Sequence, residues 1–189
     1  MKKIISVSLA VILCLLCVAA CADTWVVPIN NFPGIKVKMA DKLYSRSGPS
    51  TDYTEHGAYD ITGLIVTVLS LKYDMNAVPW VEVDYNGRRL WTGAKRLDIS
   101  SKQLAALPVE DGSFLGYGQI LSNTTPRFGP GINYALHDQK MALKKGSNIV
   151  VIKEENNYFL IECEYYDTQK RIFRCWVPVD QVSVLIDNP

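Results

Sequence analysis

An internal repeat limits the folds open to this chain more than any other feature of its sequence. Residues 46–56 match residues 127–137 in Arg, Gly, Pro, Tyr and His, without a gap, at an offset of 81 positions. The two histidines of the chain, His56 and His137, fall on matching positions within this segment. Such ordered self-similarity is typical of the duplication of one fold unit.

The match continues in the same order after the turn segment. Residues 63–69 resemble residues 146–152, since each run begins with Gly and is rich in β-branched side chains. Residues 80–85 resemble residues 160–165, and Trp91 and Trp176 then match each other. Each half is therefore expected to contain a turn, a β-rich run, a hairpin and a Trp on the return strand.

The local patterns predict strands within each unit. Residues 65–71 and 149–152 carry the β-branched residues that strands favour, and residues 80–85 alternate apolar and polar side chains. The Asn-Gly pair at residues 86–87 predicts a type I′ hairpin turn, because both residues tolerate a positive φ. Residues 88–91 then form the return strand.

These residues resemble a bacterial SH3 domain (SH3b). The first unit has the Arg46-Ser-Gly48-Pro49 turn of that family, a Gly followed by a Val-rich strand, and Trp80 before an Asn-Gly hairpin. The second unit is similar, although Phe128 replaces the Ser of the turn and the hairpin is longer. The resemblance implies a small, partly open β-barrel for each unit. It also implies a role in targeting or binding, often to peptidoglycan, and carries no catalytic activity.

We therefore predict an all-β fold with two SH3-like small β-barrels in tandem, joined by a short helix and a linker. Ser100 to Leu107 is expected to form the helix, capped by Ser100 or Ser101 and ended by Pro108. If the two units pack together, the crevice between them is the natural ligand site. The predicted segments are a signal peptide at 1–22, a first domain at 38–99, a linker at 100–118 and a second domain at 119–189.

The N-terminus has the layout of a secretory signal. Lys2 and Lys3 precede an uncharged apolar run that is too short for a stable membrane span. Two cleavage patterns fit. Residues 18–21 resemble a lipobox, in which Cys21 would receive a lipid, and Ala20-Cys21-Ala22 fits ordinary secretion. Either pattern predicts an exported protein of the cell envelope or the exterior, anchored by a lipid in the first case.

Charge and composition argue against some classes of binding partner. The chain has 20 Lys and Arg against 19 Asp and Glu, and removal of Lys2 and Lys3 leaves a formal charge of −1. No basic stripe is present, which argues against nucleic acid. The expected partners are cell-wall glycan or peptide, or an envelope protein, with membrane contact only through the lipid at Cys21. No cofactor is expected.

The last two cysteines, Cys163 and Cys175, are candidates for a disulfide in an oxidising compartment. A turn at residues 86–87 pairs Val83 with Leu90, and the repeat aligns Cys163 with Val83 and Cys175 with Leu90. Directly opposed strand positions are close enough for a cross-strand disulfide. The alternative is a pair of buried free thiols.

The motif residues are interpreted mainly as structural. We expect the two motif arginines to brace their turns by donating to backbone carbonyls, and the motif Gly and Pro residues to shape the backbone. The histidines are expected to be fixed structural groups rather than metal ligands. Trp80, Trp91 and Trp176 are expected to lie in the barrel cores. The structural motif is Arg46, Gly48, Pro49, Arg127, Gly129 and Pro130. The candidate ligand-binding residues are Tyr44, Tyr53, Tyr59 and Tyr134, since Tyr offers rigid amphipathic contact.

The sequence provides no evident catalytic centre. It has no Gly-x-Ser-x-Gly elbow, Walker loop or His-Glu-x-x-His motif, and each unit has one His. We therefore expect a non-catalytic envelope binding module that recognises peptidoglycan or another surface polymer. An envelope protein–protein adaptor is the alternative, and a divergent cell-wall hydrolase is a third, weaker hypothesis.

Overall fold

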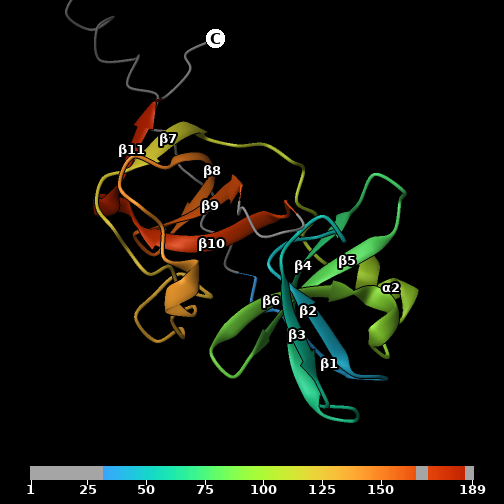
Figure 1. Ribbon diagram of the computed structural model, residues 1–189. Coiled ribbons are helices and arrows are strands. Elements are labelled where there is room, and N and C mark those ends of the chain that lie inside the picture. Colours follow the sequence, from blue (N-terminus) through green and yellow to red (C-terminus); the bar gives the residue numbers. More distant parts are fainter. Residues whose placement is uncertain (1–31, 165–169, 186–189) are drawn as a thin grey trace, which may run out of the picture. The chain divides into compact units, whose positions relative to one another are not determined.

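Two antiparallel sheets contain most of the regular backbone in the computed structural model (Figure 1). The structure describes residues 32–164 and 170–185. The predicted signal peptide at 1–22 and the predicted lipidation of Cys21 therefore lie outside the described residues. Within the described part, no helix is long and apolar enough to cross a membrane.

The first sheet has six strands in the order β1-β4-β5-β6-β2-β3. Its first strand, β1, begins at Ile35, before residue 38, where the first domain was predicted to start. The strands are β1 (Ile35–Lys38), β2 (Leu43–Arg46), β3 (Glu55–Tyr59), β4 (Ile65–Tyr73), β5 (Pro79–Tyr85) and β6 (Arg88–Gly93).

The second sheet has five strands in the order β10-β9-β8-β7-β11. Its β7 begins at Gly116, within the segment expected to be linker. The strands are β7 (Gly116–Ile120), β8 (Asn148–Glu155), β9 (Tyr158–Glu164), β10 (Ile172–Pro178) and β11 (Val182–Leu185). The short helices are η2 (Ala94–Arg96), α2 (Ser101–Ala105), η3 (Gln139–Met141) and η4 (Val179–Gln181).

The two sheets repeat one order of elements. The neighbours β1, β4, β5 and β6 of the first sheet correspond to β7, β8, β9 and β10 of the second, and η2 and η4 follow β6 and β10. The predicted mainly β architecture is therefore confirmed. Neither sheet closes on itself, since β1 and β3 end the first sheet and β10 and β11 end the second.

The hairpin between β5 and β6 has the predicted turn and register. Asn86 has φ 49° and Gly87 has φ 67°, as a type I′ turn requires. Tyr85 pairs with Arg88, and Val83 pairs with Leu90.

The second hairpin has a different register from the one predicted. Cys163 lies opposite Phe173 and Cys175 lies opposite Ile161, so the cysteines are diagonal neighbours about 7–8 Å apart at Cα, beyond ordinary disulfide reach. Both thiols are free. The predicted opposition of the two cysteines is wrong, and the bridge that depends on it is not formed.

The physical reason is the length of the preceding hairpin. Five residues connect β4 to β5, and these strands also carry an extra pair, Tyr73 with Pro79. The corresponding β8 and β9 turn directly at Asn156 and Asn157, both with positive φ. The predicted alignment allows for the longer connection but not for the extra pair. It therefore places β9 two positions out of alignment. In the structure, Cys163 corresponds to Tyr85 rather than to Val83.

Each sheet covers its own apolar core. The three tryptophans predicted to be core, Trp80, Trp91 and Trp176, are buried but belong to neither cluster. The first core contains Val37, Met39, Leu43, Ile61, Val66, Val68, Leu71, Val81, Val83, Leu90, Ala94, Leu97 and Leu107. The second contains Ile120, Leu143, Ile149, Val151, Ile161, Phe173, Cys175, Val177 and Val182.

The segment between the repeats is held to both sheets. Ser100 caps α2 with a capping box that includes Gln103, which confirms the predicted helix start. After Pro108, Glu110 N donates to Leu71 O at 2.9 Å, and Leu115 N donates to Val151 O at 2.7 Å. These bonds attach the linker to β4 on one side and to β8 on the other.

Candidate functional site

The repeated turn has the same bonding pattern in both halves. Nη1 of Arg46 donates to the carbonyls of Thr51 at 3.0 Å and Tyr53 at 2.8 Å. Nη1 of Arg127 likewise donates to the carbonyls of Ile132 at 3.3 Å and Tyr134 at 2.8 Å. The prediction that these arginines brace their turns is confirmed.

The glycine of each turn makes room for a tyrosine ring. A Cβ added to Gly48 would lie 2.2 Å from Cδ1 of Tyr53, and one added to Gly129 would lie 2.2 Å from Cδ1 of Tyr134. The backbone role predicted for these glycines is confirmed, and the reason is close approach. Pro49 and Pro130 are buried beside them.

Each repeat places an arginine between aromatic rings of the other repeat. The guanidinium carbon of Arg174 lies 5.4 Å from the ring centroid of Tyr53 and 5.8 Å from that of Trp91. In the reverse direction, Arg89 lies 5.4 Å from the Tyr134 centroid and 5.6 Å from the Trp176 centroid. We call these the first and second arginine slots. Cation–π attraction stabilises such contacts, more strongly when water is excluded.

Acidic side chains complete both slots. Tyr53 Oη donates to Glu162 Oε1 at 2.7 Å, and Arg174 donates to the same oxygen from Nε at 2.8 Å and Nη2 at 2.6 Å. Tyr134 Oη donates to Asp84 at 3.2 Å. Asp84 and Glu162 hold matching positions, because each lies directly opposite the slot arginine of its own hairpin.

Backbone hydrogen bonds cross between the repeats in the same reciprocal way. Thr54 N donates to Ile172 O at 2.8 Å, and Ala135 N donates to Gly87 O at 2.9 Å. Thr54 and Ala135 each follow the slot tyrosine, while Gly87 and Ile172 each precede the slot arginine by two positions. The two repeats therefore pack through an approximately two-fold arrangement.

Arg89 and Arg174 differ in their remaining partners. Arg89 donates to both oxygens of Glu155, at 3.0 and 2.7 Å. Arg174 Nη1 donates to Glu110 of the linker at 2.9 Å. Burial alone would lower the pKa of Arg174, but Glu110 and Glu162 raise it above its ordinary value. Burial raises the pKa of the Tyr53 phenol, so both side chains keep their usual protonation state.

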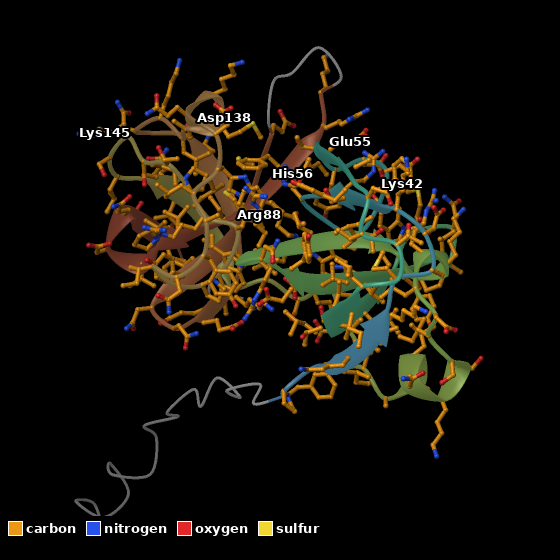
Figure 2. All side chains as sticks on the ribbon, turned by 90° about the horizontal axis from the view of Figure 1, so that it is seen from below. Lys42, Glu55, His56, Arg88, Asp138 and Lys145 are labelled. Atoms are coloured by element: carbon orange, nitrogen blue, oxygen red, sulfur yellow. The ribbon has the colours of Figure 1, made fainter. Side chains whose placement is uncertain are left out.

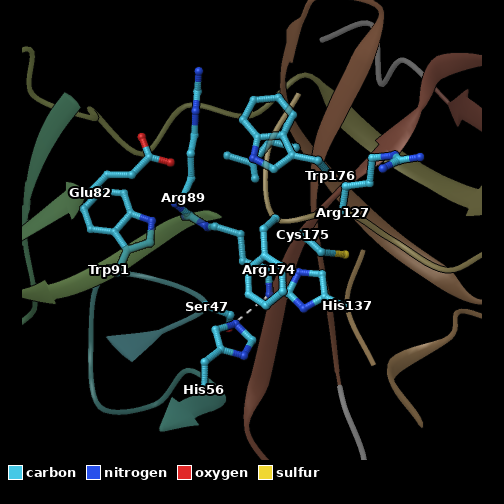
Figure 3. A pocket seen from close by; sticks show the side chains of 12 residues that line it. Ser47, His56, Glu82, Arg89, Trp91, Arg127, His137, Arg174, Cys175 and Trp176 are labelled. Carbon is cyan, nitrogen blue, oxygen red and sulfur yellow. Dashed lines mark hydrogen bonds between the residues drawn. The ribbon is translucent and has the colours of Figure 1, made fainter. Parts of the chain in front are cut away.

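Two histidines, His56 (Figure 2) and His137, lie together at the centre of the contact between the repeats (Figure 3). The His56 and His137 rings are 5.1 Å apart between centroids, and His137 stacks on Phe128 at 3.7 Å. Burial lowers the pKa of His56 to about 4, and burial together with His56 lowers that of His137 to about 3. Both are therefore neutral at pH 7.

The cavity between these rings is too small for an organic ligand. It has a volume of about 10 Å³, roughly the room that one water molecule needs. Figure 3 shows His56 and His137 with Arg89, Arg174 and the slot tryptophans around it. In the described segments, no group of three or more His, Cys, Asp or Glu side chains is placed to hold a metal ion.

A larger hollow of about 310 Å³, here called the linker groove, lies between β4, β8 and the linker. Its walls combine cationic, acidic and apolar side chains. The lining residues are Tyr53, Lys72, Val109, Glu110, Asp111, Gly112, Ser113, Phe114, Val150, Ile152, Lys153, Glu162 and Arg174.

The structure does not bring the four predicted ligand tyrosines together. Tyr53 and Tyr134 belong to the arginine slots, and Tyr53 alone of the four also lines the groove. Tyr59 packs against the first core, and its ring centroid lies 6.3 Å from that of Tyr85. Tyr44 is exposed on β2, where Arg96 lies 4.4 Å from its ring centroid.

Sequence reasoning missed the slot arginines and the groove lysines. A signal for the arginines is present, because Arg89 and Arg174 each stand two positions before a repeated Trp. No comparable signal marks Lys72 and Lys153, which come from strands of different repeats and line the same groove.

Comparison with known proteins assigns no family to the chain. No family model matches it, and no curated protein matches it.

Proposed function

We propose that this chain is an exported, non-catalytic binding module of the cell envelope that holds peptidoglycan in its linker groove. The observation that carries the proposal is the groove itself. It has the size of a small ligand site, and it combines apolar walls with a few placed charges, as binding pockets usually do. A rigid frame supports it, because Arg174 fixes Glu110 of the linker and Glu162 of β9 together.

The assignment to the envelope rests on the sequence. The secretory layout of residues 1–22 supports export, and lipidation at Cys21 would hold the protein at a membrane face. The resemblance to SH3b domains supports wall binding. We interpret each repeat as a partly open SH3-like barrel, for which the shared order of strands and turns is the support.

Sedimentation with purified sacculi tests the proposal. The wild-type protein is expected to co-sediment, and a variant carrying Phe114→Ala, Lys72→Ala and Lys153→Ala is expected to remain in the supernatant. Tyr44→Ala is the matched control, because it removes an exposed aromatic side chain outside the groove. Failure of the wild-type protein to sediment under any condition would count against wall binding.

One observation favours an envelope protein adaptor as the second candidate. Four large apolar side chains near the start of the second sheet are exposed, and Tyr117 lies opposite Leu185 on paired edge and inner strands. The Phe114 and Tyr117 rings contact each other edge to face at 5.5 Å. The exposed residues are Phe114, Leu115, Tyr117 and Leu185. Exposed apolar clusters often mark protein-binding surfaces.

Crosslinking in intact envelopes separates the two candidates. Capture of one dominant protein partner, lost with Tyr117→Ala while binding to sacculi persists, would favour the adaptor. Sacculus binding that is unaffected by Tyr117→Ala and abolished by the groove variant would favour the wall-binding module.

A further inference from the structure

We propose that the edge strand β11 pairs with β11 of a second copy of this chain, which joins the second sheets of the two copies about a two-fold axis. The inference goes beyond wall binding and does not depend on the linker groove. It names a second copy, rather than another protein, as the partner of the exposed apolar cluster beside β11. Antiparallel pairing about a two-fold axis needs the same surface on both partners, and a second copy provides it.

The four strands that end the two sheets of the described residues differ in how their edges are protected. Exposed charges, bulges and covering segments commonly prevent pairing with another chain. Lys36 and Lys38 are exposed on β1, and the pairing of β3 with β2 contains a bulge. The outer side of β10 is covered, because Trp176 exchanges backbone hydrogen bonds with Arg127. In contrast, β11 (Val182–Leu185) ends its sheet without a charged residue, a proline or a bulge (Figure 1).

The side chains on the outer face beside this edge form an apolar row across three strands. Leu185 of β11 lies opposite Tyr117 of β7, and Tyr117 lies opposite Val150 of β8. Leu185 is 66% exposed and Tyr117 is 51% exposed, while the Phe114 ring packs edge to face on Tyr117. A two-fold axis perpendicular to the sheet keeps the same face of both copies on one side. Pairing of β11 with its copy would therefore continue this row from one chain into the other.

The first repeat has a lysine where the second has Tyr117. Lys36 pairs with Thr67, and Tyr117 pairs with Val150. Thr67 and Val150 hold the same place before the matching bulges of β4 and β8, so Lys36 and Tyr117 correspond. An exposed position that accepts Lys in one copy of the fold unit does not need an aromatic ring for folding. The ring is therefore available for contact with a partner.

The edge itself differs between the repeats in the same direction. The segment after η2 holds the place of β11, because Asp98 N donates to Lys38 O of β1 at 2.9 Å. Counted from η2 and η4, Asp98 corresponds to Ser183, and Ser100 corresponds to Leu185. Asp98 exposes a charge, and the chain leaves the sheet at Ser100 to form α2. The second repeat thus presents an uncharged edge strand where the first presents a charged segment that ends in a helix.

The size of this surface predicts a weak dimer. A pair of four-residue strands makes few backbone hydrogen bonds, and the apolar contribution comes from a small number of side chains. Interfaces at the lower end of the usual size range are commonly transient. We therefore expect association at micromolar rather than nanomolar concentrations of protein.

Sedimentation velocity over a roughly hundredfold range of protein concentration tests the inference. The full chain carries Cys21→Ser, so that a lipid cannot drive association, and this parent protein is expected to change from monomer to dimer as its concentration rises. A variant that also carries Ser183→Asp and Leu185→Ser should dissociate at least about tenfold more readily, because like charges oppose each other across the paired strands. The fold is expected to accept both substitutions, since they introduce the residues that the first repeat has at these positions.

Leu64→Ser is the matched control, because it removes a leucine that is 52% exposed on the first repeat. Its dimerisation should equal that of the parent protein. Hydrogen exchange on the parent protein at low and high concentration locates the contact without a further substitution, since the amides of β11 should gain protection as the dimer forms.

Three results would each overturn the inference. The first is a parent protein that is monomeric at every concentration, including one whose exposed cluster crosslinks instead to a different envelope protein. The second is a dimer that the double substitution in β11 leaves intact. The third is a dimer whose formation does not protect the amides of β11.

Discussion

Gly48 and Gly129 each lie under a tyrosine ring, and this contact forms one wall of an arginine slot. Gly48→Ala should force a Cβ to within 2.2 Å of Tyr53, so either the ring or the turn must move. We expect the free energy of unfolding in urea to fall by about 1–3 kcal/mol. Gly93→Ala should change it little, because Gly93 has φ −64° and the nearest atom to its Cβ position is 3.9 Å away.

The two central histidines predict a loss of stability in mild acid. Their pKa values in the folded protein, about 4 and 3, lie below the ordinary value of 6.5. At a pH between the folded and the ordinary values, the unfolded chain therefore binds more protons than the folded protein. The stabilisation is complete above pH 6.5 and declines as the pH falls toward 4. Each histidine should contribute roughly 2 kcal/mol of this loss between pH 7 and pH 5.

Urea unfolding at pH 7 and pH 5 measures the effect before most carboxylates titrate. A double variant, His56→Gln with His137→Gln, should have a much smaller difference between the two pH values, whatever its absolute stability. An unchanged difference in the double variant would show that other groups are responsible.

At the level of elements, the register of the second hairpin decides the state of the cysteines. Burial raises the pKa of the Cys163 thiol to about 12 and raises that of Cys175 well above its ordinary value. Native protein should therefore react slowly with a thiol reagent, and unfolded protein should react rapidly at both positions. Peptide mapping that finds a Cys163–Cys175 bridge in the folded protein would contradict the observed register.

The elements differ in how far sequence determines them. The Asn86-Gly87 turn and the Ser100 cap depend on residues a few positions apart, so local patterns predicted both. The register of β9 depends on one extra residue pair in the other hairpin, which no local pattern reports. The slots were missed because the partner of Tyr53 is Arg174 of the other repeat, and that contact exists only after the repeats pack.

The candidate site, like the fold, was predicted only where local patterns determine it. The turn motif was predicted with its bracing arginines, because Arg, Gly, Pro and Tyr recur at one spacing. Tyr53 and Tyr134 were assigned to a ligand because Tyr offers rigid amphipathic contact. Packing of the repeats instead places those half-buried rings against Arg174 and Arg89. The groove follows from the path of the linker, which composition alone does not fix.

For the whole molecule, the reciprocal slots predict that neither repeat is stable independently of the other. Arg174→Met should leave the partly buried carboxylates of Glu110 and Glu162 without their main cation, and lower the free energy of unfolding by about 3–5 kcal/mol. Arg96→Met is the comparison, because Arg96 pairs with the exposed Asp41 and contacts Tyr44 at the surface. Loss of this exposed pair should lower the free energy of unfolding far less than loss of Arg174. Equal losses in the two variants would contradict a structural role for the first slot.

Hydrogen exchange on Arg174→Met tests the reciprocal packing most directly. Arg174 belongs to the second sheet, and its slot is formed by Tyr53 and Trp91 of the first. If each repeat completes the other, backbone amides of β5 and β6 should lose protection by about the same free energy as those of β9 and β10. Loss of protection confined to β9 and β10, with β5 and β6 unchanged, would show that the repeats are stable separately and would contradict the reciprocal slots.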